Sequence, residues 1–157
     1  MDQKGYTLVE LVVGMAIMTI IMTGILGVLG VSVASYHYAQ KRTYEVQQAR
    51  IAINELVNDL QKATTITEPA KGATSSRAVY AIGSDNYTVE IGTGANAGCI
   101  VRNGNRITAN IVKDITFERD SSDGRMMTVT VVLNNPENNS TGEFMLSTKV
   151  FSPNLTR

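Results

Sequence analysis

The sequence predicts an α+β protein in which one long N-terminal helix is followed by an antiparallel sheet. The first observation is an uncharged apolar run at residues 11–33, followed by a stretch from Gln40 to Ile66 that contains no Gly or Pro. The second is a change of period: from Ala78 onward apolar residues alternate with polar ones, which is typical of strands. A sheet with one apolar face needs a cover, and the helix can supply it.

The apolar run from Leu11 to Val33 holds 23 residues without a charge or a proline. As a helix it is roughly 34 Å long, enough to cross a hydrocarbon core of about 30 Å. A secretory signal peptide has a shorter apolar stretch of ~7–15 residues. A core helix of a soluble protein is the other alternative, but the rest of the chain can hardly cover such a helix on every side. We therefore expect a membrane-spanning helix.

The flanking charges leave the orientation of this helix ambiguous, because Lys4 precedes it and Lys41 and Arg42 follow it. The few residues before the run most simply stay in the cytoplasm, since the C-terminal side carries a whole domain. The aromatic residues 36–38 lie just past the run. They fit either an interfacial aromatic belt at the outer surface or ordinary packing and solvent contact on the same helix.

Beyond the run, apolar residues recur at spacings of 3, 4, 3, 4 and 3, which places them on one narrow stripe of a helix. They are Val46, Ala49, Ile53, Leu56, Leu60 and Ala63. A coiled coil has the same spacing, but fewer than three full heptads are present. We expect the stripe to pack on the sheet, and the amphipathic half of the helix to occupy residues 36–68, ending before Pro69.

Seven strand segments are expected in the remaining residues, 69–157. They are Ala78–Ile82, residues 87–91, a hairpin of Cys99–Arg102 with Arg106–Ile111, a strand through Ile115 and Phe117, residues 127–133, and residues 144–150. Asn103-Gly104 suits the positive φ angles of a tight turn and marks the hairpin. The expected domain is one small antiparallel sheet covered by the helical stripe.

Composition argues against several classes of function. The net charge is zero with no basic run, so direct nucleic-acid binding is unsupported. Cys99 is the single cysteine, which rules out an intramolecular disulfide, and we expect it to be buried. No cluster with metal-ligand spacing, phosphate-binding loop or nucleophile elbow occurs. We predict no enzyme activity, no metal and no cofactor.

Glu10 stands at the edge of the apolar run, where a carboxylate without a partner is costly and suggests a functional site. Lys4 lies six residues earlier, outside the i,i+3 and i,i+4 reach of a helix. A cut after Gly5 would create a positive α-amino group at Tyr6, close to Glu10. This amine could pair with Glu10 of its own chain or of a neighbour. Between neighbours the pair would select one axial stagger, because breaking a buried pair costs ~3–5 kcal/mol.

The segment from Gly5 through Glu10 and its apolar continuation resembles the prepilin processing motif of type IV pilins and type II secretion pseudopilins. The resemblance implies cleavage between Gly5 and Tyr6 by a membrane peptidase, N-methylation of Tyr6, and recognition of Lys4 and Gly5. It also implies that Glu10 acts in assembly. The sequence departs from the common pattern at Tyr6, where phenylalanine is usual, and at Gly27, where many pilins have proline. Together with Gly24 and Gly30, Gly27 could weaken the helix locally.

The resemblance implies a pilin-like fold with a leader at 1–5 and a transmembrane and filament-core segment at 6–35. The amphipathic helix at 36–68 and the sheet domain at 69–157 follow. The expected protein is a structural subunit of a pilus or secretion filament, most similar to a J-type minor pseudopilin or minor pilin. Its expected partners are other pilin-type subunits, the prepilin peptidase, an inner-membrane assembly platform and, before assembly, membrane lipid. A bacterial membrane protein that reaches the cell surface is implied. A membrane-anchored binding domain and a competence pseudopilin remain alternatives.

Overall fold

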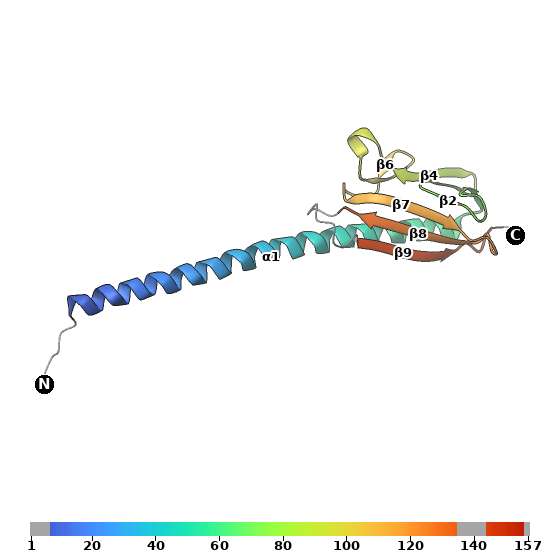
Figure 1. Ribbon diagram of the computed structural model, residues 1–157. Coiled ribbons are helices and arrows are strands. Elements are labelled where there is room, and N and C mark those ends of the chain that lie inside the picture. The colour runs from blue at the N-terminus through green and yellow to red at the C-terminus, as the bar shows by residue number, and fades with distance from the viewer. Residues whose placement is uncertain (1–6, 135–143, 156–157) are drawn as a thin grey trace. The chain divides into compact units, whose positions relative to one another are not determined.

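The structure is a computed structural model, and it describes residues 7–134 and 144–155 (Figure 1). One helix, α1 (Leu8–Lys62), is followed by strands and a short 3-10 helix at Gly94–Asn96. The strands are β1 (Thr65–Glu68), β2 (Thr74–Ser75), β3 (Ala78–Ile82), β4 (Asp85–Ile91), β5 (Ile100–Arg102), β6 (Asn105–Arg106), β7 (Val112–Arg119), β8 (Met126–Leu133) and β9 (Phe144–Phe151). The predicted α+β class, with a long N-terminal helix packed on antiparallel strands, is confirmed. The chain divides into two compact units, residues 1–43 and 44–157.

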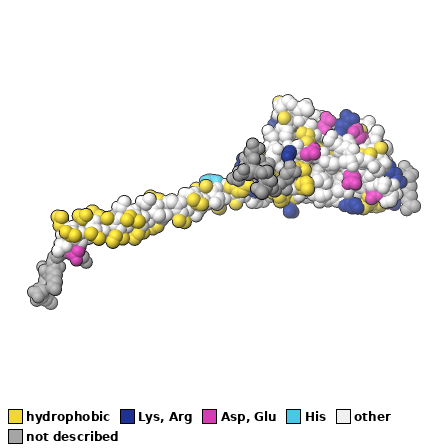
Figure 2. Space-filling model, viewed as in Figure 1, with side chains coloured by type: hydrophobic (Ala, Val, Ile, Leu, Met, Phe, Trp, Pro, Cys, Tyr) yellow, Lys and Arg dark blue, Asp and Glu magenta, His cyan; other side chains and the backbone are white. Residues whose placement is uncertain are grey.

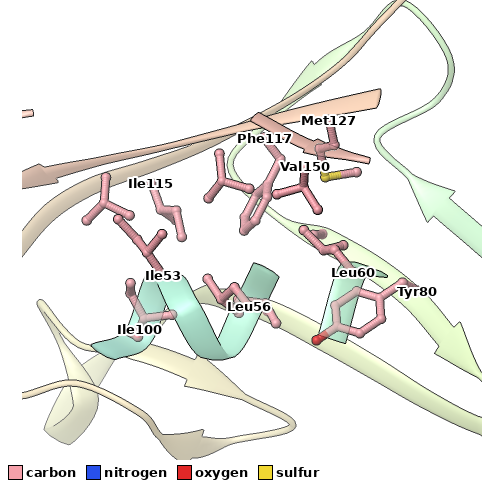
Figure 3. Packing of buried hydrophobic residues seen from close by; sticks show 14 of the residues in the cluster. Ile53, Leu56, Leu60, Tyr80, Ile100, Ile115, Phe117, Met127 and Val150 are labelled. Carbon is pink, nitrogen blue, oxygen red and sulfur yellow. The ribbon is translucent and has the colours of Figure 1, made fainter. Parts of the chain in front are cut away.

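The second unit has its core between α1 and two sheets. Ala49, Ile53, Leu56 and Leu60 of α1 are buried, and Ala63 just past its end is fully buried. These are the predicted stripe residues, with Val46 partly buried beside them. Figure 3 shows Ile53 and Leu56 of the helix within the same cluster as residues from both sheets. The stripe therefore covers the sheets, as its spacing predicts.

The strands form two antiparallel sheets, whereas the sequence predicted one. The five-stranded sheet has the order β1-β3-β4-β5-β6, and the four-stranded sheet has the order β2-β7-β8-β9. The short strand Thr74–Ser75 leaves its sequence neighbours and pairs with Phe117 and Glu118 of β7. A two-residue strand lacks an alternating pattern long enough to be recognised, so the division into two sheets could not be seen in the sequence.

The helix ends at Lys62, six residues before the predicted limit at 68, and residues 65–68 form β1 instead. The Thr64 amide donates to the carbonyl oxygen of Ala81 at 2.8 Å, which replaces a helical bond with a cross-strand bond. Thr64, Thr65, Ile66 and Thr67 are all β-branched, a composition that favours strand over helix. The expected boundary at 68 is therefore wrong.

The hairpin between β5 and β6 forms at the predicted turn. Asn103 and Gly104 have φ angles of 50° and 80°, the positive values that such a tight turn needs. The second strand is only two residues long, not the predicted Arg106–Ile111. The Ile100 amide donates to the Thr108 hydroxyl at 2.8 Å, so a side chain takes the place of the next ladder bond.

One polar network ties α1 to the five-stranded sheet. The Arg102 guanidinium contacts a carboxylate oxygen of Asp59 at 2.7 Å and one of Glu55 at 2.8 Å. The Tyr80 hydroxyl donates to Asp59 at 2.9 Å. The Tyr80 ring stacks on Tyr87 at 5.6 Å between centroids. Burial, and then its hydrogen bond to Asp59, raise the pKa of Tyr80, so the phenol stays protonated and keeps donating.

Candidate processing and assembly site at the N-terminus

The first turn of α1 is closed by a reciprocal hydrogen-bonded cap between Thr7 and Glu10. The Glu10 amide donates to the Thr7 hydroxyl oxygen at 3.3 Å. Oε2 of Glu10 in turn accepts from the Thr7 amide at 2.9 Å and from the Thr7 hydroxyl at 3.0 Å. This is a capping box, in which the helix-start residue and the residue three positions on satisfy each other's free amide groups. A carboxylate in the first turn also suits the positive end of the helix dipole.

The cap engages only one of the two carboxylate oxygens of Glu10. Both hydrogen bonds from Thr7 reach Oε2, and within the described residues Oε1 has no hydrogen-bond partner. Because a carboxylate offers about four acceptor positions, Oε1 can take a further donor without displacing Thr7. Glu10 is thus held in place by its own chain and still presents an open acceptor.

The helix beyond Glu10 presents apolar side chains in every direction. Ile20 and Met18 are 73% and 71% exposed, and all described residues from 7 to 41 are classed as exposed. Figure 2 shows hydrophobic side chains along this part of the helix, whereas charged side chains gather on the globular unit. The helix is long and apolar enough to cross a membrane, and none of its most apolar span is buried. A soluble core helix would be mostly buried, so this surface requires lipid or protein around it.

Two threonine hydroxyls inside the apolar segment are satisfied locally. The Thr19 hydroxyl donates to the Met15 carbonyl oxygen at 2.8 Å, and the Thr23 hydroxyl donates to the Thr19 carbonyl oxygen at 2.8 Å. Such bonds to the preceding turn remove the cost of placing a hydroxyl in hydrocarbon. The helix surface is therefore compatible with an apolar surrounding along this segment.

Glycines leave this helix surface open. Gly24 lies in a shallow apolar groove together with Ile21, Ile25, Val28 and Leu29. No atom lies within 4 Å of the position that a Cβ would take at Gly24, Gly27 or Gly30. The structure has a continuous α-helix through these glycines, so local weakening of the helix there stays a prediction.

Three of the predicted site residues, Lys4, Gly5 and Tyr6, lie outside the described residues. Glu10 is therefore the one predicted site residue that lies within the described part of the chain. Its hydrogen bonds add Thr7 to the site. The signal for Thr7 was present in the sequence, because Thr-x-x-Glu before an apolar run is the pattern of a capping box.

Residues 1–26 match the family model of the prokaryotic N-terminal methylation motif. No curated protein matches the chain. No solved structure matches it either. The match covers residues 1–6, the capping box and about two thirds of the apolar run.

The match supports the resemblance of the first residues to the N-terminal motif of type IV pilin and pseudopilin precursors. The motif, the apolar helix and the α+β domain agree with this class. Precursors of this class are processed by prepilin peptidase and assemble with other pilin-type subunits, and the class is structural rather than enzymatic. An apolar N-terminal helix of this kind fits membrane anchoring followed by a place in a surface filament.

The globular unit has no group of three or more potential metal ligands among residues 7–134 and 144–155. Cys99 is buried at 1% exposure, as predicted, and its thiol lies 3.9 Å from the Ala97 carbonyl oxygen. The carboxylate of Asp120 is hydrogen-bonded within its own turn, where it accepts from the amides of Ser122 and Asp123. These bonds and one from the Ser122 hydroxyl hold the pKa of Asp120 down at about 2.

Proposed function

We propose that this protein is a minor structural subunit of a type IV pilus-like or type II secretion filament. On this proposal prepilin peptidase cuts between Gly5 and Tyr6 and the new N-terminus of Tyr6 is methylated. The mature chain then leaves the membrane through an inner-membrane assembly platform and enters the filament by its N-terminal helix. The N-terminus faces the cytoplasm before assembly.

The observation that carries the proposal is the position of Glu10 in the first turn of an exposed apolar helix, inside the matched motif. A carboxylate at the entrance to hydrocarbon favours a cationic partner. A terminal amine at Tyr6 would be such a partner, and Oε1 of Glu10 is open to it. Because Thr7 already holds the carboxylate through Oε2, the Glu10 side chain loses less conformational freedom when it pairs with the amine.

The decisive test separates the charge of Glu10 from its capping role. Glu10→Gln keeps an acceptor oxygen for the Thr7 amide, since Gln is accepted at this position of a capping box, but it removes the negative charge. We expect Glu10→Gln to be cut and methylated normally and to leave surface filaments without this subunit. The readouts are the N-terminal residue and mass of the chain, and immunodetection of the subunit in sheared filaments.

Glu10→Asp is the matched control, because it keeps the charge on a shorter side chain; we expect it to retain part of the assembly. Incorporation of Glu10→Gln at the wild-type level would contradict the amine-pairing mechanism. A processed wild-type chain that never enters a filament would favour a membrane-anchored binding domain instead.

A second experiment tests the processing step. Replacing Gly5 with leucine places a bulky side chain at the proposed cleavage position, and we expect the precursor to accumulate uncut in the membrane. A mature N-terminus at any residue other than Tyr6 in the wild-type protein would refute the proposed site. N-terminal sequencing of the membrane-extracted chain measures both outcomes.

A further inference from the structure

The outward face of α1 in the globular unit carries a second stripe of residues, opposite the buried one. We call it the outer stripe; its members are Tyr44, Gln47, Ile51, Asn54, Asn58 and Gln61, and all six are exposed. Their spacings are 3, 4, 3, 4 and 3, the heptad pattern of a helix seam. At 100° per residue the centre of the outer stripe lies about 200° from that of the buried stripe. The sheets therefore leave it accessible.

The outer stripe differs from an ordinary solvated helix face because it carries no charge. Ile51 and Tyr44 are large hydrophobic residues that are 59% and 55% exposed. The other four are amides, which can hydrogen-bond to the same residues of an identical helix. A solvent-facing helix stripe usually mixes polar with charged residues. The outer stripe covers two and a half heptads with no charge and two large exposed hydrophobic residues, so it has the composition of a helix contact rather than of a solvated face.

The positions that flank the outer stripe are complementary in charge. In heptad terms Tyr44, Ile51 and Asn58 take the a positions, which puts Arg50 at g and Glu55 at the following e position. In a parallel, in-register pair of helices, a g residue lies beside the e residue five positions on in the partner. Arg50 of each copy would then lie beside Glu55 of the other, whose Oε1 also contacts Arg102 of its own chain at 2.8 Å.

The in-register arrangement also brings Asn58 against Asn58. A single Asn at an a position is a known device for selecting two parallel strands in register. Two chains anchored in one membrane by the same end of α1 meet in the same orientation, so a parallel pair is the one available to them. The parallel orientation, and the effective concentration of the pair, rest on the proposed membrane anchoring.

We propose that the outer stripe is the contact surface for a second copy of this chain, as a parallel and in-register helix pair in the membrane before assembly. The seam has one aliphatic a residue and several amides, so the pair is weak and reversible. Confinement of both chains to one membrane raises their effective concentration and makes such a contact sufficient. Separation of the pair then leaves each chain free to enter a filament.

The test is disulfide crosslinking of the full-length chain in membranes, using the uncleaved Gly5→Leu precursor so that no filament contributes. Ile51→Cys places a thiol at the centre of the seam, and we expect a crosslinked homodimer. The control is Asp85→Cys at the start of β4, an exposed position away from α1, which should stay monomeric. The native Cys99 is buried, so the otherwise unmodified precursor supplies the background.

Charge reversal tests the register. In the Ile51→Cys chain, Arg50→Glu puts two carboxylates side by side, and we expect at least a fivefold loss of homodimer. Lys62→Glu makes the same change of charge at an e position whose partner is Val57, and it should leave the yield within twofold of the parent chain.

Equal crosslinking at Ile51→Cys and Asp85→Cys would indicate random collision and overturn the proposal. An adduct with a different chain in place of a homodimer would also overturn it, as would equal yields from the two charge variants. None of these outcomes depends on whether filaments form, so the failure of this proposal and of the proposed function can be told apart.

Discussion

The two halves of α1 share one backbone geometry and differ completely in what surrounds them. Residues 11–33 present apolar side chains on all faces, and every residue of α1 through Lys41 is exposed. Residues 44–62 bury one stripe against two sheets and expose another. The apolar half has a large hydrophobic surface, but its residues through Lys41 are exposed and form no buried core. Hydrophobicity alone therefore does not tell where a helix packs; the angular distribution of the apolar residues does.

The largest effect is expected from truncating the buried stripe. Leu56 is 1% exposed within the core, so Leu56→Ala should lower the free energy of unfolding of the globular unit by about 3 kcal/mol. Leu26 in the apolar half is 64% exposed, and Leu26→Ala should leave that free energy unchanged. Urea unfolding of the detergent-solubilised chain, followed by the β-sheet circular dichroism signal, measures both. Equal losses would mean that the two halves are not energetically separate.

The next effect concerns the polar tie between α1 and the five-stranded sheet. Asp59→Ala removes the acceptor that serves both Arg102 and Tyr80, and we expect a loss of about 2 kcal/mol in the free energy of unfolding. Glu55→Ala removes only the more exposed contact of Arg102 and should cost less than about 1 kcal/mol. If the two substitutions cost the same, Asp59 is not the centre of this network.

A smaller, local effect is expected at the first turn of the apolar half. Thr7→Ala removes the hydroxyl that caps the Glu10 amide, so amide hydrogen exchange of Glu10 should become several-fold faster in detergent micelles. Thr7→Ser keeps the hydroxyl and should exchange at the wild-type rate. Exchange within the globular unit should not change in either variant. Unchanged exchange in Thr7→Ala would show that the helix start does not depend on the capping box.

The smallest effect is a pH dependence that the globular unit has and the apolar segment lacks. Residues 11–33 contain no ionisable side chain, whereas Asp120 in the globular unit has a pKa held near 2 by its hydrogen bonds. Because an unfolded Asp titrates at about 3.9, this stabilisation is complete above that pH and is lost as the pH falls toward 2. Ser122→Ala should raise the pKa of Asp120, measured by NMR titration of its carboxyl carbon. A pKa that does not move would assign the shift to the backbone amides of Ser122 and Asp123.

Local patterns in the sequence predicted most of this architecture. The bounds of Ala78–Ile82, the turn at Asn103-Gly104 and the buried stripe all appear in the structure as expected. These features depend on spacing and on turn chemistry within a few residues. The sequence also contains the capping-box pattern of Thr7 and Glu10, which supplies a partner for the carboxylate within its own helical turn.

The missed features depend on contacts between residues far apart in the chain. Arg102 and Asp59 are separated by 43 positions, and no local pattern links them. Arg119 donates to the carbonyl oxygen of Ile66 at 2.9 Å across 53 positions and so joins the two sheets. Strand β1 forms because Ala81 offers a cross-strand partner, which the sequence around Thr65 cannot show. Partners of this kind are set by the tertiary fold and not by propensity.

The capping box has a consequence for the timing of maturation. Every bond of the box lies at or beyond Thr7, so a cut after Gly5 would remove none of them. The hydrogen bonds that begin the helix would therefore remain after the proposed removal of residues 1–5. The proposed cleavage would instead change the charge: the Glu10 carboxylate would gain a positive α-amino group at Tyr6 as a neighbour in the sequence. The proposed maturation would thus add a positive charge at Tyr6 and leave the hydrogen bonds between Thr7 and Glu10 unchanged.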